Sequence, residues 1–418
     1  MNITLKNGQR SGVTSAPSSK SHAQRLLICA GLGASGVTLD CGDISKDIAA
    51  AASCVQTLCA DVTELHEGVL RVEPCAKPSD GVKALHCGES GSTLRFLIPV
   101  CGALGESVVF KMEGRLSERP LSPLDEVLHE HGMTLERIGT ELHCSGKLTG
   151  GEFEIAGNVS SQFISGLLFA LPLLDTDSAL TVTGKLESSA YIAMTENALR
   201  QSGIEFAKNG NVYTVPGNQR YRLNETCTVE GDLSNAAFFL CMGALSDNGV
   251  TVKNIPEHTS QGDKKIIDIL RLFGADVTVS GDSVTVKKGR LTACTVDAAE
   301  IPDLMPVVSV VAAAAEGDAH IINAARVRLK ESDRLMTTAT LLCGLGASVE
   351  ELPDGLIVHG GRPLHGGTID SFNDHRIAMS AAVAACICTG PVTVTGCECV
   401  NKSFPRFWEK FNGLECGQ

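Results

Sequence analysis

One pattern recurs six times along this chain of 418 residues. In each copy a mostly polar opening leads into an apolar helix of roughly four turns, which ends near a glycine and runs into a β-like Val/Thr segment. Successive openings are 73, 69, 72, 69 and 71 residues apart. So regular a period indicates an internal repeat, whose units bury their apolar faces against one another. The openings begin at Ser18, Gly91, Ser160, Asp232, Ile301 and Phe372.

A second helix is predicted after each opening, and it keeps the same period. Successive starts are 73, 70, 71, 72 and 71 residues apart, and each helix ends in a glycine before a β-branched or aliphatic residue. Units one to five then continue with hairpin-like alternation, which is clearest over residues 277–286. Each unit is therefore predicted to be α-β-α-β-β. The second helices are expected to begin near Asp43, Leu116, Leu186, Glu257, Leu329 and Val400.

The sixth unit reaches Gln418 without its strands, whereas the first 15 residues contain a segment of the missing type. We therefore expect the N-terminal strand to complete the last unit. Because the chain is too long for a single core, two domains are the natural prediction. Three units each give one domain at 18–230 and another made of 1–17 plus 231–418.

The predicted class is α/β, with helices inside each domain and sheets outside. The runs 163–174 and 304–315 are apolar nearly all round, which suits a buried helix better than a surface helix. Aromatic residues make up only 4% of the chain while glycine occurs 43 times, so the cores are small-residue and aliphatic. The two domains are expected to be similar, each with three repeated units in an inside-out arrangement.

Composition excludes several classes of function. A net charge of −13 argues against nucleic acid as a partner. No apolar run approaches the length of a membrane span, and residues 2–6 alternate where a signal peptide would be apolar, so a cytoplasmic protein is expected. The 17 cysteines lack paired CxxC spacing and are interpreted as free thiols. His129 to His131 precede Gly132 and are interpreted as an exposed helix end, so neither a metal nor a cofactor is expected.

The first opening carries the clearest candidate for binding chemistry. Ser18 and Ser19 stand where a helix cap is expected, and Lys20, Ser21 and Arg25 follow in the first two turns. A helix N-terminus already offers free N–H groups and a partial positive charge. Adding a lysine, an arginine and hydroxyls makes a site for phosphate or carboxylate. The structural alternative is an ordinary capped surface helix.

Other openings of the first half allow the same pair of interpretations. Gly91 follows a Gly/Ser turn that either lets backbone N–H groups approach an anion or simply reverses the chain. Arg115 and Arg119 lie in a loop that either presents guanidinium groups to an anion or is solvated. Ser160, Ser161 and Gln162 offer hydroxyls and an amide, or only a helix cap.

The second half carries charged candidates. Asp303 could accept a proton or cap a helix. Lys330 and Arg334 are expected four apart on one helical face with Glu331 beside them, which is also the usual pattern of a salt-bridged surface. His375 and Arg376 open the sixth helix, where an anion is again favoured, and Lys402 is either a ligand or an exposed lysine.

Together the openings predict a protein that closes on a small polyanion. If the six buried helices point their N-termini toward the cleft between the domains, their partial positive charges converge there. Neither a Walker A sequence nor a GxGxxG after a strand occurs, so a nucleotide cofactor is not implied.

These motifs, in this order, resemble the 3-phosphoshikimate 1-carboxyvinyltransferase (EPSP synthase) family of enolpyruvyl transferases. The resemblance covers essentially the whole chain and rests on SKSxxxR, the GxxGxxxR turn, ERP, SSQF, EGD, IPD, KESDRL, NDHR and NKSFP. It implies an inside-out α/β fold of two three-unit domains, which agrees with the repeat count. It also implies transfer of the enolpyruvyl group of phosphoenolpyruvate to shikimate 3-phosphate in the shikimate pathway, with release of phosphate.

The resemblance assigns roles by motif. Binding of shikimate 3-phosphate is implied for Lys20, Ser21, Arg25, Ser160, Ser161, Gln162, Ser188, Tyr191, Asp303 and Lys330. Binding of phosphoenolpyruvate is implied for Lys20, Gly91, Arg119, Gln162, Arg334, Arg376 and Lys402. The catalytic residues implied are Lys20, Asp303, Glu331 and His375. The domain 18–230 is expected to hold shikimate 3-phosphate and the other to close over phosphoenolpyruvate. A monomer is expected because the repeats satisfy one another, and Gly91 implies sensitivity to glyphosate.

Three alternatives are weighed from the sequence. The sister family, UDP-N-acetylglucosamine enolpyruvyl transferase, shares the donor, but its reactive cysteine lies in the loop that corresponds to residues 111–123, where this chain has no cysteine. A non-catalytic polyanion-binding module is the second alternative, and the presence of Lys20, Asp303, Glu331, His375 and Lys402 argues against it. An RNA-end cyclase would need a nucleotide site and a basic surface.

Overall fold

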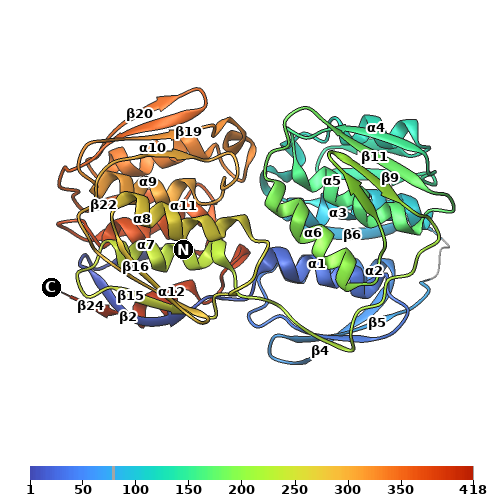
Figure 1. Ribbon diagram of the computed structural model, residues 1–418, viewed down its shortest axis with the longest axis horizontal. Helices are drawn as coiled ribbons and strands as arrows, with labels where there is room; N and C mark the ends of the chain where they lie inside the picture. Colours follow the sequence, from blue (N-terminus) through green and yellow to red (C-terminus); the bar gives the residue numbers. More distant parts are fainter. Residues whose placement is uncertain (78–80, 418) are drawn as a thin grey trace. The chain divides into compact units, whose positions relative to one another are not determined.

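The computed structural model describes residues 1–77 and 81–417, which form two compact units (Figure 1). Unit 1 consists of Met1–Ser18 together with the chain from Glu230 onward, and unit 2 is Ser19–Val229. The mixed α/β class with several sheets agrees with the predicted fold class.

Unit 2 has core helices that are buried on nearly every side. In α3 and α5 the first and last turns are buried as well as the middle, and the two helices pack against each other. Helix α1 packs against α2 and α6. The core helices are α1 (Lys20–Gly31), α3 (Gly91–Leu104) and α5 (Ser161–Ala170), and the second helices are α2 (Lys46–Leu58), α4 (Leu124–Glu130) and α6 (Ser189–Gln201). Short 3-10 helices are η1 (Gly114–Glu118) and η2 (Leu171–Leu173).

The sheets of unit 2 share one plan: a parallel pair of strands is extended by an antiparallel hairpin. In the order of hydrogen-bonded neighbours, the first sheet is β14 (Thr226–Thr228), β3 (Val37–Asp40), β5 (Val69–Pro74) and β4 (Ala60–His66). The second is β6 (Lys83–Gly88), β7 (Val108–Met112), β9 (Glu141–Ser145) and β8 (Thr134–Ile138). The third is β10 (Glu152–Ala156), β11 (Ser178–Thr183), β13 (Val212–Val215) and β12 (Ala207–Asn209).

Unit 1 repeats this design around α7, α9 and α11, which pack against one another. Every residue of α7 and of α11 is buried, so both are interior helices. The core helices are α7 (Leu233–Ala244), α9 (Met305–Ala314) and α11 (His375–Ala385), and the second helices are α8 (Ile266–Phe273), α10 (Arg334–Gly344) and α12 (Phe407–Asn412). The 3-10 helices are η3 (Gly262–Lys265), η4 (Ala325–Leu329) and η5 (Cys397–Lys402).

The sheets of unit 1 flank these helices, with β19 and β20 on one side and β15 and β2 on another (Figure 1). One sheet is β16 (Asp276–Ser280), β17 (Ser283–Lys287), β15 (Val250–Lys253), β2 (Arg10–Ser15) and β24 (Glu415–Cys416). Another is β18 (Thr295–Asp297), β19 (Asp318–Ile322), β21 (Gly355–His359) and β20 (Ser348–Leu352). The last is β1 (Asn2–Leu5), β23 (Val392–Thr395) and β22 (Gly367–Asp370). Because β1 pairs with β23, the N-terminal strand completes the sixth repeat as predicted.

The predicted α-β-α-β-β repeat omits one strand that the structure contains. A short strand, such as β6 or β10, precedes the core helix and pairs in parallel with the strand that follows that helix. Two of these strands are exchanged between repeats. β2 precedes α1 in the chain but pairs with β15, and β14 precedes α7 but pairs with β3. Strands of three to six residues carry too little alternation to be recognised by periodicity.

Polar caps account for most core-helix starts. Side chains of Ser19, Ser90, Ser160, Asp232 and Asp374 accept a hydrogen bond from a backbone N–H in the first turn of their helices. Helix α9 begins later than the opening at Ile301 suggested, at Met305 and without a side-chain cap, whereas α11 begins at His375, which was predicted to open the sixth helix.

The second helices also begin later than predicted. At four of the predicted starts the chain first forms a 3-10 helix, η1, η3, η4 or η5, and the α-helix follows. Proline is one reason, since Pro120 and Pro123 separate η1 from α4 and cannot donate a backbone hydrogen bond. A fresh cap is another, since Asp333 accepts from the Met336 N–H and starts α10.

Over the described ranges, no helix is long and apolar enough to span a membrane, and no group of three or more His, Cys, Asp or Glu side chains could hold a metal ion. All 17 cysteines are free thiols. The interpretation of His131 as a solvated residue needs revision. Its ring stacks on Phe153 with centroids 3.6 Å apart, and its two nitrogens lie 3.2 and 3.1 Å from the carbonyl oxygens of Thr149 and Glu152.

Candidate active site

Lys20 is the first residue of α1 and is held by an aspartate of α2. Its Nζ lies 2.9 Å from Oδ2 of Asp47, and the side chains are only 16% and 7% exposed. Asp47 stands in the first turn of α2, where a negative charge also complements the helix N-terminus. Lys20 is therefore a positioned, half-buried cation rather than a solvated one.

Arg25 is already well bound by its own unit. Its Nε donates to Thr195 Oγ1 at 2.9 Å, Nη1 to the Ser21 carbonyl at 2.7 Å and Nη2 to the Tyr191 carbonyl at 2.8 Å. Its guanidinium lies 4.9 Å from the centre of the Phe96 ring. Burial lowers the pKa of Arg25 to about 10. The predicted residues Ser21, Arg25 and Tyr191 are thus brought together, at the starts of α1 and α6.

A second cluster in unit 2 gathers around Arg95. Its Nη1 donates to Gln162 Oε1 at 2.7 Å, and its Nη2 donates to the Pro120 carbonyl at 3.2 Å. A Cβ built on Gly91 would lie 2.8 Å from Arg119 Nη1 and 3.1 Å from Arg95 Nη1, so both guanidinium groups face the first residue of α3. Three predicted residues, Gly91, Arg119 and Gln162, therefore surround Arg95, the last residue of the GxxGxxxR motif, to which the sequence assigned no role.

The predicted hydroxyl residues lie at the starts of α5 and α6. Ser160 Oγ caps α5 by accepting from the Gln162 N–H at 3.3 Å, so the cap interpretation is correct for this residue. Ser161 is the buried first residue of α5. Ser188 precedes α6 with a left-handed φ of 54°, a conformation that few side chains adopt. Thr195 Oγ1 donates to Ser165 Oγ at 2.8 Å and ties the two helices together.

In unit 1 the candidates meet around Arg334, whose side chain is 1% exposed. Its Nη1 lies 2.7 Å from Asp303 Oδ1, its Nη2 lies 2.9 Å from Glu331 Oε2, and its Nε lies 2.8 Å from Asp374 Oδ2. A second contact joins Nη2 and Asp374 Oδ1 at 3.2 Å. One guanidinium thus holds three carboxylates in place, and we call these four residues the Arg334 cluster.

Lys330 and Arg334 do not share a helical face, so that prediction was wrong. Helix α10 begins at Arg334, whereas Lys330 is the C-cap residue that follows η4 and has an extended backbone (φ −85°, ψ −159°). The two side chains still converge, because Lys330 Nζ lies 3.3 Å from Asp303 Oδ1. Asp303 does not cap α9, since α9 has no side-chain cap. Its carboxylate serves the cations instead.

Opposing forces act on the ionisation of the Arg334 cluster. Burial by itself would raise the pKa of Asp303, but the charges of Lys330, Arg334 and Arg376 hold it well below the usual range. Burial likewise disfavours the charged form of Arg334, yet its three carboxylates raise its pKa well above the ordinary value. Both groups are therefore ionised across the neutral pH range.

His375 and Arg376 begin α11 beside this cluster. His375 is 1% exposed, and its Nδ1 lies 3.8 Å from Asp374 Oδ1. Arg376 Nη1 donates to the Ser234 carbonyl at 2.8 Å, and its Nη2 lies 3.8 Å from Asp303 Oδ2. Asp374 also caps α11 by accepting from the Arg376 N–H at 2.9 Å. The start of the sixth core helix thus contributes to the same cluster.

Lys402 is not the exposed lysine of the structural alternative. It is the last residue of η5 and only 6% exposed. Burying an ammonium is costly unless other groups compensate its charge. The side chain therefore belongs to the interior of unit 1.

With this geometry in place, comparisons identify the family. A sequence model described as "EPSP synthase (3-phosphoshikimate 1-carboxyvinyltransferase)" matches residues 6–411. The chain belongs to the EPSP synthase family. The 3-phosphoshikimate 1-carboxyvinyltransferase of Clostridium novyi is 38% identical over 421 residues, which cover 98% of this chain and 96% of the relative. The enzyme of that name from Clostridium acetobutylicum is 41% identical over 404 residues, covering 95% and 94%.

Solved structures of EPSP synthase and of a related transferase share the fold. A structure of EPSP synthase from Acinetobacter baumannii has a TM-score of 0.80 at 24% identity and covers all of both chains. The enolpyruvyl transferase NikO from Streptomyces tendae has a TM-score of 0.78 at 16% identity, covering 99% of this chain and 98% of that one. The predicted α/β class with two similar domains is therefore that of the EPSP synthase family.

Several buried side chains that hold the site in place were not predicted from the sequence. Asp47 pairs with Lys20, and Arg95 holds Gln162, although 27 and 67 residues separate the partners. Asp263 is a third case, a 4% exposed carboxyl at η3 that accepts a hydrogen bond from Ser234. The repeat offered one signal, because Asp47 and Asp263 both stand at the start of a second helix.

Asp263 is expected to make stability depend on pH. Burial, followed by the nearby charge of Asp303, raises the pKa of Asp263 to about 6. The folded state therefore binds this proton more tightly than the unfolded state between about pH 4 and 6, and stability falls as pH rises through that window. Asp263→Asn should raise the free energy of unfolding by roughly 1–3 kcal/mol at pH 8 and by about half as much at pH 5, since one pKa unit corresponds to about 1.4 kcal/mol and pH 5 lies near the middle of the window.

Urea unfolding at pH 5 and pH 8, followed by fluorescence, measures this difference. The chain has a single tryptophan, Trp408, and it lies in unit 1 with Asp263. Asp268→Asn is the matched control, because Asp268 is 79% exposed in the adjoining α8. A pH-independent gain in Asp263→Asn would show that Asp263 does not titrate in this window.

Proposed function

We propose that this chain transfers the enolpyruvyl group of phosphoenolpyruvate to the 5-hydroxyl of shikimate 3-phosphate and releases inorganic phosphate. Membership of the EPSP synthase family over residues 6–411 supports this reaction. The observation that carries the proposal most directly is the Arg334 cluster, in which Asp303 is held ionised beside Lys330 and Arg376. Substrates with phosphate and carboxylate groups suit such cations, and the ionised carboxylates can accept a proton.

The residues of unit 2 suit shikimate 3-phosphate. Lys20 and Arg25 offer positive charge, and the starts of α1 and α5 offer backbone N–H groups and hydroxyls. We assign the phosphate and hydroxyls of this substrate to Lys20, Ser21, Arg25, Ser160, Ser161, Gln162, Ser188 and Tyr191 in unit 2 and to Asp303 and Lys330 in unit 1. The domain 18–230 is thus the shikimate 3-phosphate side of the proposal.

Phosphoenolpyruvate carries a phosphate and a carboxylate, so it needs several cations. We assign it to Lys20, Gly91, Arg119, Gln162, Arg334, Arg376 and Lys402. Arg334 presents four of its hydrogen bonds to carboxylates of this chain, so its contact with the substrate uses its remaining capacity or displaces one of them. Arg119 faces the first residue of α3, where the free N–H groups of the helix add to its charge.

The reaction requires two proton exchanges. The methylene carbon of phosphoenolpyruvate gains a proton while the 5-hydroxyl of shikimate 3-phosphate loses one and attacks the adjacent carbon. The resulting tetrahedral intermediate then loses a proton and phosphate. We assign these exchanges to Lys20, Asp303 and Glu331, with His375 as a further catalytic residue, because these are titratable groups at helix starts.

Phosphate release from phosphoenolpyruvate tests the proposal. Release with shikimate 3-phosphate and none with UDP-N-acetylglucosamine is the expected result, and Lys20→Ala should abolish it. Release with the sugar nucleotide alone would assign the chain to the sister reaction. A folded sample that releases no phosphate with either acceptor would leave a non-catalytic binding module.

We also propose that the protein acts as a monomer in the cytoplasm. The core helices of each unit are covered by its own sheets, so the repeats bury one another within one chain. All 17 cysteines are free, as is usual in a reducing compartment. Light scattering on a size-exclusion column would contradict the monomer if the mass were a multiple of 43.8 kDa.

Gly91→Ala is expected to weaken binding of phosphoenolpyruvate. The added Cβ would lie 2.8 Å from Arg119 Nη1, so the guanidinium must move, while the backbone need not. We expect KM for phosphoenolpyruvate to rise about tenfold or more, equivalent to about 1.4 kcal/mol, with a smaller change in kcat. Steady-state kinetics with shikimate 3-phosphate saturating measures both constants.

Gly413→Ala is the control for this substitution, because its Cβ would approach no atom closer than 3.4 Å. An unchanged KM in Gly91→Ala would show that Arg119 does not bind this substrate. With Gly91 in place, glyphosate is expected to inhibit turnover. Full turnover at saturating glyphosate would contradict that expectation.

A further inference from the structure

A pocket of about 380 Å³ lies in unit 1 at the C-terminal ends of the three core helices. Leu245 caps α7, Ala314 is the last residue of α9, and Ile387 follows the cap of α11. These are the ends opposite to the helix starts that carry the candidate active site. At a rise of about 1.5 Å per residue, ten to twelve residues of helix separate the two sites by roughly 15–18 Å. We call it the helix-end pocket.

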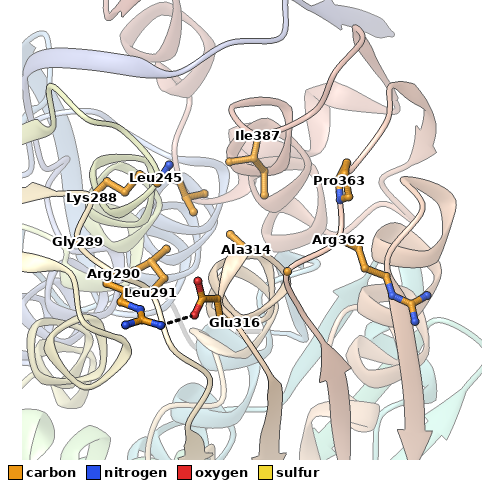
Figure 2. Close-up of a pocket in the computed structure, with 11 residues that line it drawn as sticks. Leu245, Lys288, Gly289, Arg290, Leu291, Ala314, Glu316, Arg362, Pro363 and Ile387 are labelled. Atoms are coloured by element: carbon orange, nitrogen blue, oxygen red, sulfur yellow. Dashed lines mark hydrogen bonds and ion pairs between the residues drawn. The ribbon is translucent and has the colours of Figure 1, made fainter.

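The floor of the helix-end pocket is apolar. Leu245 and Leu291 are 1% and 5% exposed, and Ala314 and Ile387 are partly exposed beside them. Figure 2 shows Leu245, Ala314 and Ile387 around one common space. A volume of this size is within the range of small-molecule sites, which are mostly apolar with a few placed polar groups.

Loops around the pocket satisfy the ends of the helices. The Gly361 N–H donates to the Ala313 carbonyl at 3.2 Å, and the Lys288 N–H donates to the Ser246 carbonyl at 2.9 Å. These two backbone carbonyls are therefore engaged within the protein. What remains for a ligand is the apolar floor and the side chains of the rim.

The rim carries three cations and one carboxylate. Arg290 is 84% exposed and pairs with Glu316 at 3.0 Å, as Figure 2 shows. Lys288 is 45% exposed and lies 3.8 Å from Asp247 Oδ1. Within the described residues Arg362 makes no ion pair and no side-chain hydrogen bond, and it lies on the opposite side of the pocket from Arg290 (Figure 2). The lining residues thus carry a net charge of +2 in a chain whose net charge is −13.

We propose that the helix-end pocket is a second binding site, for a small amphiphilic carboxylate with an aromatic or branched apolar body. The apolar body covers Leu245, Leu291 and Ile387, and the carboxylate pairs with Arg362, whose exposed side chain turns toward the floor when the ligand binds. Because Arg362 has no ion-pair partner among the described residues, its guanidinium is available for a bidentate contact with a carboxylate. Glu316 disfavours a large polyanion, and the floor offers a compact anion nothing to bind. The site does not depend on the proposed catalytic function.

Titration calorimetry with 3-phenylpropionate tests the proposal on the whole protein. The expected result is binding with a Kd of about 1 mM or tighter. The neutral 3-phenylpropan-1-ol should bind at least tenfold more weakly, and inorganic phosphate should not displace the carboxylate. No measurable heat at about 10 mM probe would overturn the proposal, as would full displacement by phosphate.

Variants locate the binding. Arg362→Gln should weaken binding of 3-phenylpropionate at least fivefold by removing the charge, and Ala314→Leu should do so by filling the floor with the charges intact. Arg220→Gln, an exposed arginine of unit 2, is the matched control and should leave the Kd unchanged. Trp408 fluorescence during urea unfolding establishes that unit 1 is folded in each variant. If both pocket variants bind as the original chain does, the probe lies elsewhere, and the cations only complement the helix ends.

Discussion

Arg334→Met is expected to destabilise unit 1 by roughly 3–5 kcal/mol at pH 7, because it leaves three carboxylates beside one another without their shared cation. Asp374 is fully buried and the exposed fractions of Glu331 and Asp303 are 14% and 19%, so water cannot replace the guanidinium well. Methionine fills a similar volume, which makes the lost charge the main change. Urea unfolding followed by Trp408 fluorescence reports the effect on this unit specifically.

Two further measurements separate charge from packing in this variant. Arg271→Met is the matched control, because Arg271 is 47% exposed and pairs with the exposed Asp268, and it should cost less than about 0.5 kcal/mol. The deficit of Arg334→Met should also shrink between pH 7 and pH 5. Without Arg334 the pKa of Asp303 rises, because burial is then opposed by fewer cations, so Asp303 takes up a proton as the pH falls and the repulsion among the carboxylates weakens. A deficit that is the same at both pH values would contradict the charge explanation.

The fold was predictable because one sequence pattern, a polar opening followed by an apolar helix, recurs six times along the chain. A single apolar run such as residues 163–174 could be a strand or a helix, but six runs with one period allow fewer interpretations. The same repetition predicted that the N-terminal strand would complete the sixth repeat, and β1 does pair with β23. The missed strands, β6 and its equivalents, are short and pair with a strand beyond a helix. Their stability comes from tertiary contacts, which local patterns do not contain.

The polar starts of the core helices were predictable from the sequence, but the partners of the side chains there were not. Helix starts carry caps and charges that a sequence displays, so Lys20, Gly91 and His375 could be proposed from position alone. Some predicted residues are held by groups from another repeat of the same unit. Asp374 reaches Arg334 across 40 residues, and Arg95 reaches Gln162 across 67. Such pairings follow from the packing of helices around a shared core.

The error at Lys330 and Arg334 has a similar origin. Four-residue spacing predicts neighbours on a helix. The ammonium group of Lys330 and the guanidinium group of Arg334 do lie close to each other. They meet at Asp303, which lies before a different helix, because Asp333 ends the preceding segment and starts α10. A spacing rule can therefore predict a correct contact for the wrong reason. The contact itself has to be tested by changing the shared partner.

Asp303→Asn is that test, and we expect it to lower kcat about 10²–10⁴-fold, the range for loss of a group that exchanges a proton with the substrate. The amide keeps the size of the side chain and can still accept a hydrogen bond, and Arg334 retains Glu331 and Asp374. Unfolding should therefore change much less than in Arg334→Met. Phosphate release from phosphoenolpyruvate with saturating shikimate 3-phosphate measures kcat.

The pH profile shows whether the titration of Asp303 itself limits turnover, and the size of the fall in kcat distinguishes a proton-exchanging Asp303 from one that only supplies charge. Since the pKa of Asp303 is held well below its usual range, its own protonation should not limit turnover at any pH above about 4. Any acid limb between pH 5 and 7 then belongs to another group and should persist, at reduced height, in Asp303→Asn. Asp318→Asn, an aspartate that is 60% exposed in the same unit, is the control and should keep full activity. A fall of less than tenfold in Asp303→Asn would assign the proton exchange to Glu331 or Lys20 and leave Asp303 as the anchor of Lys330 and Arg334.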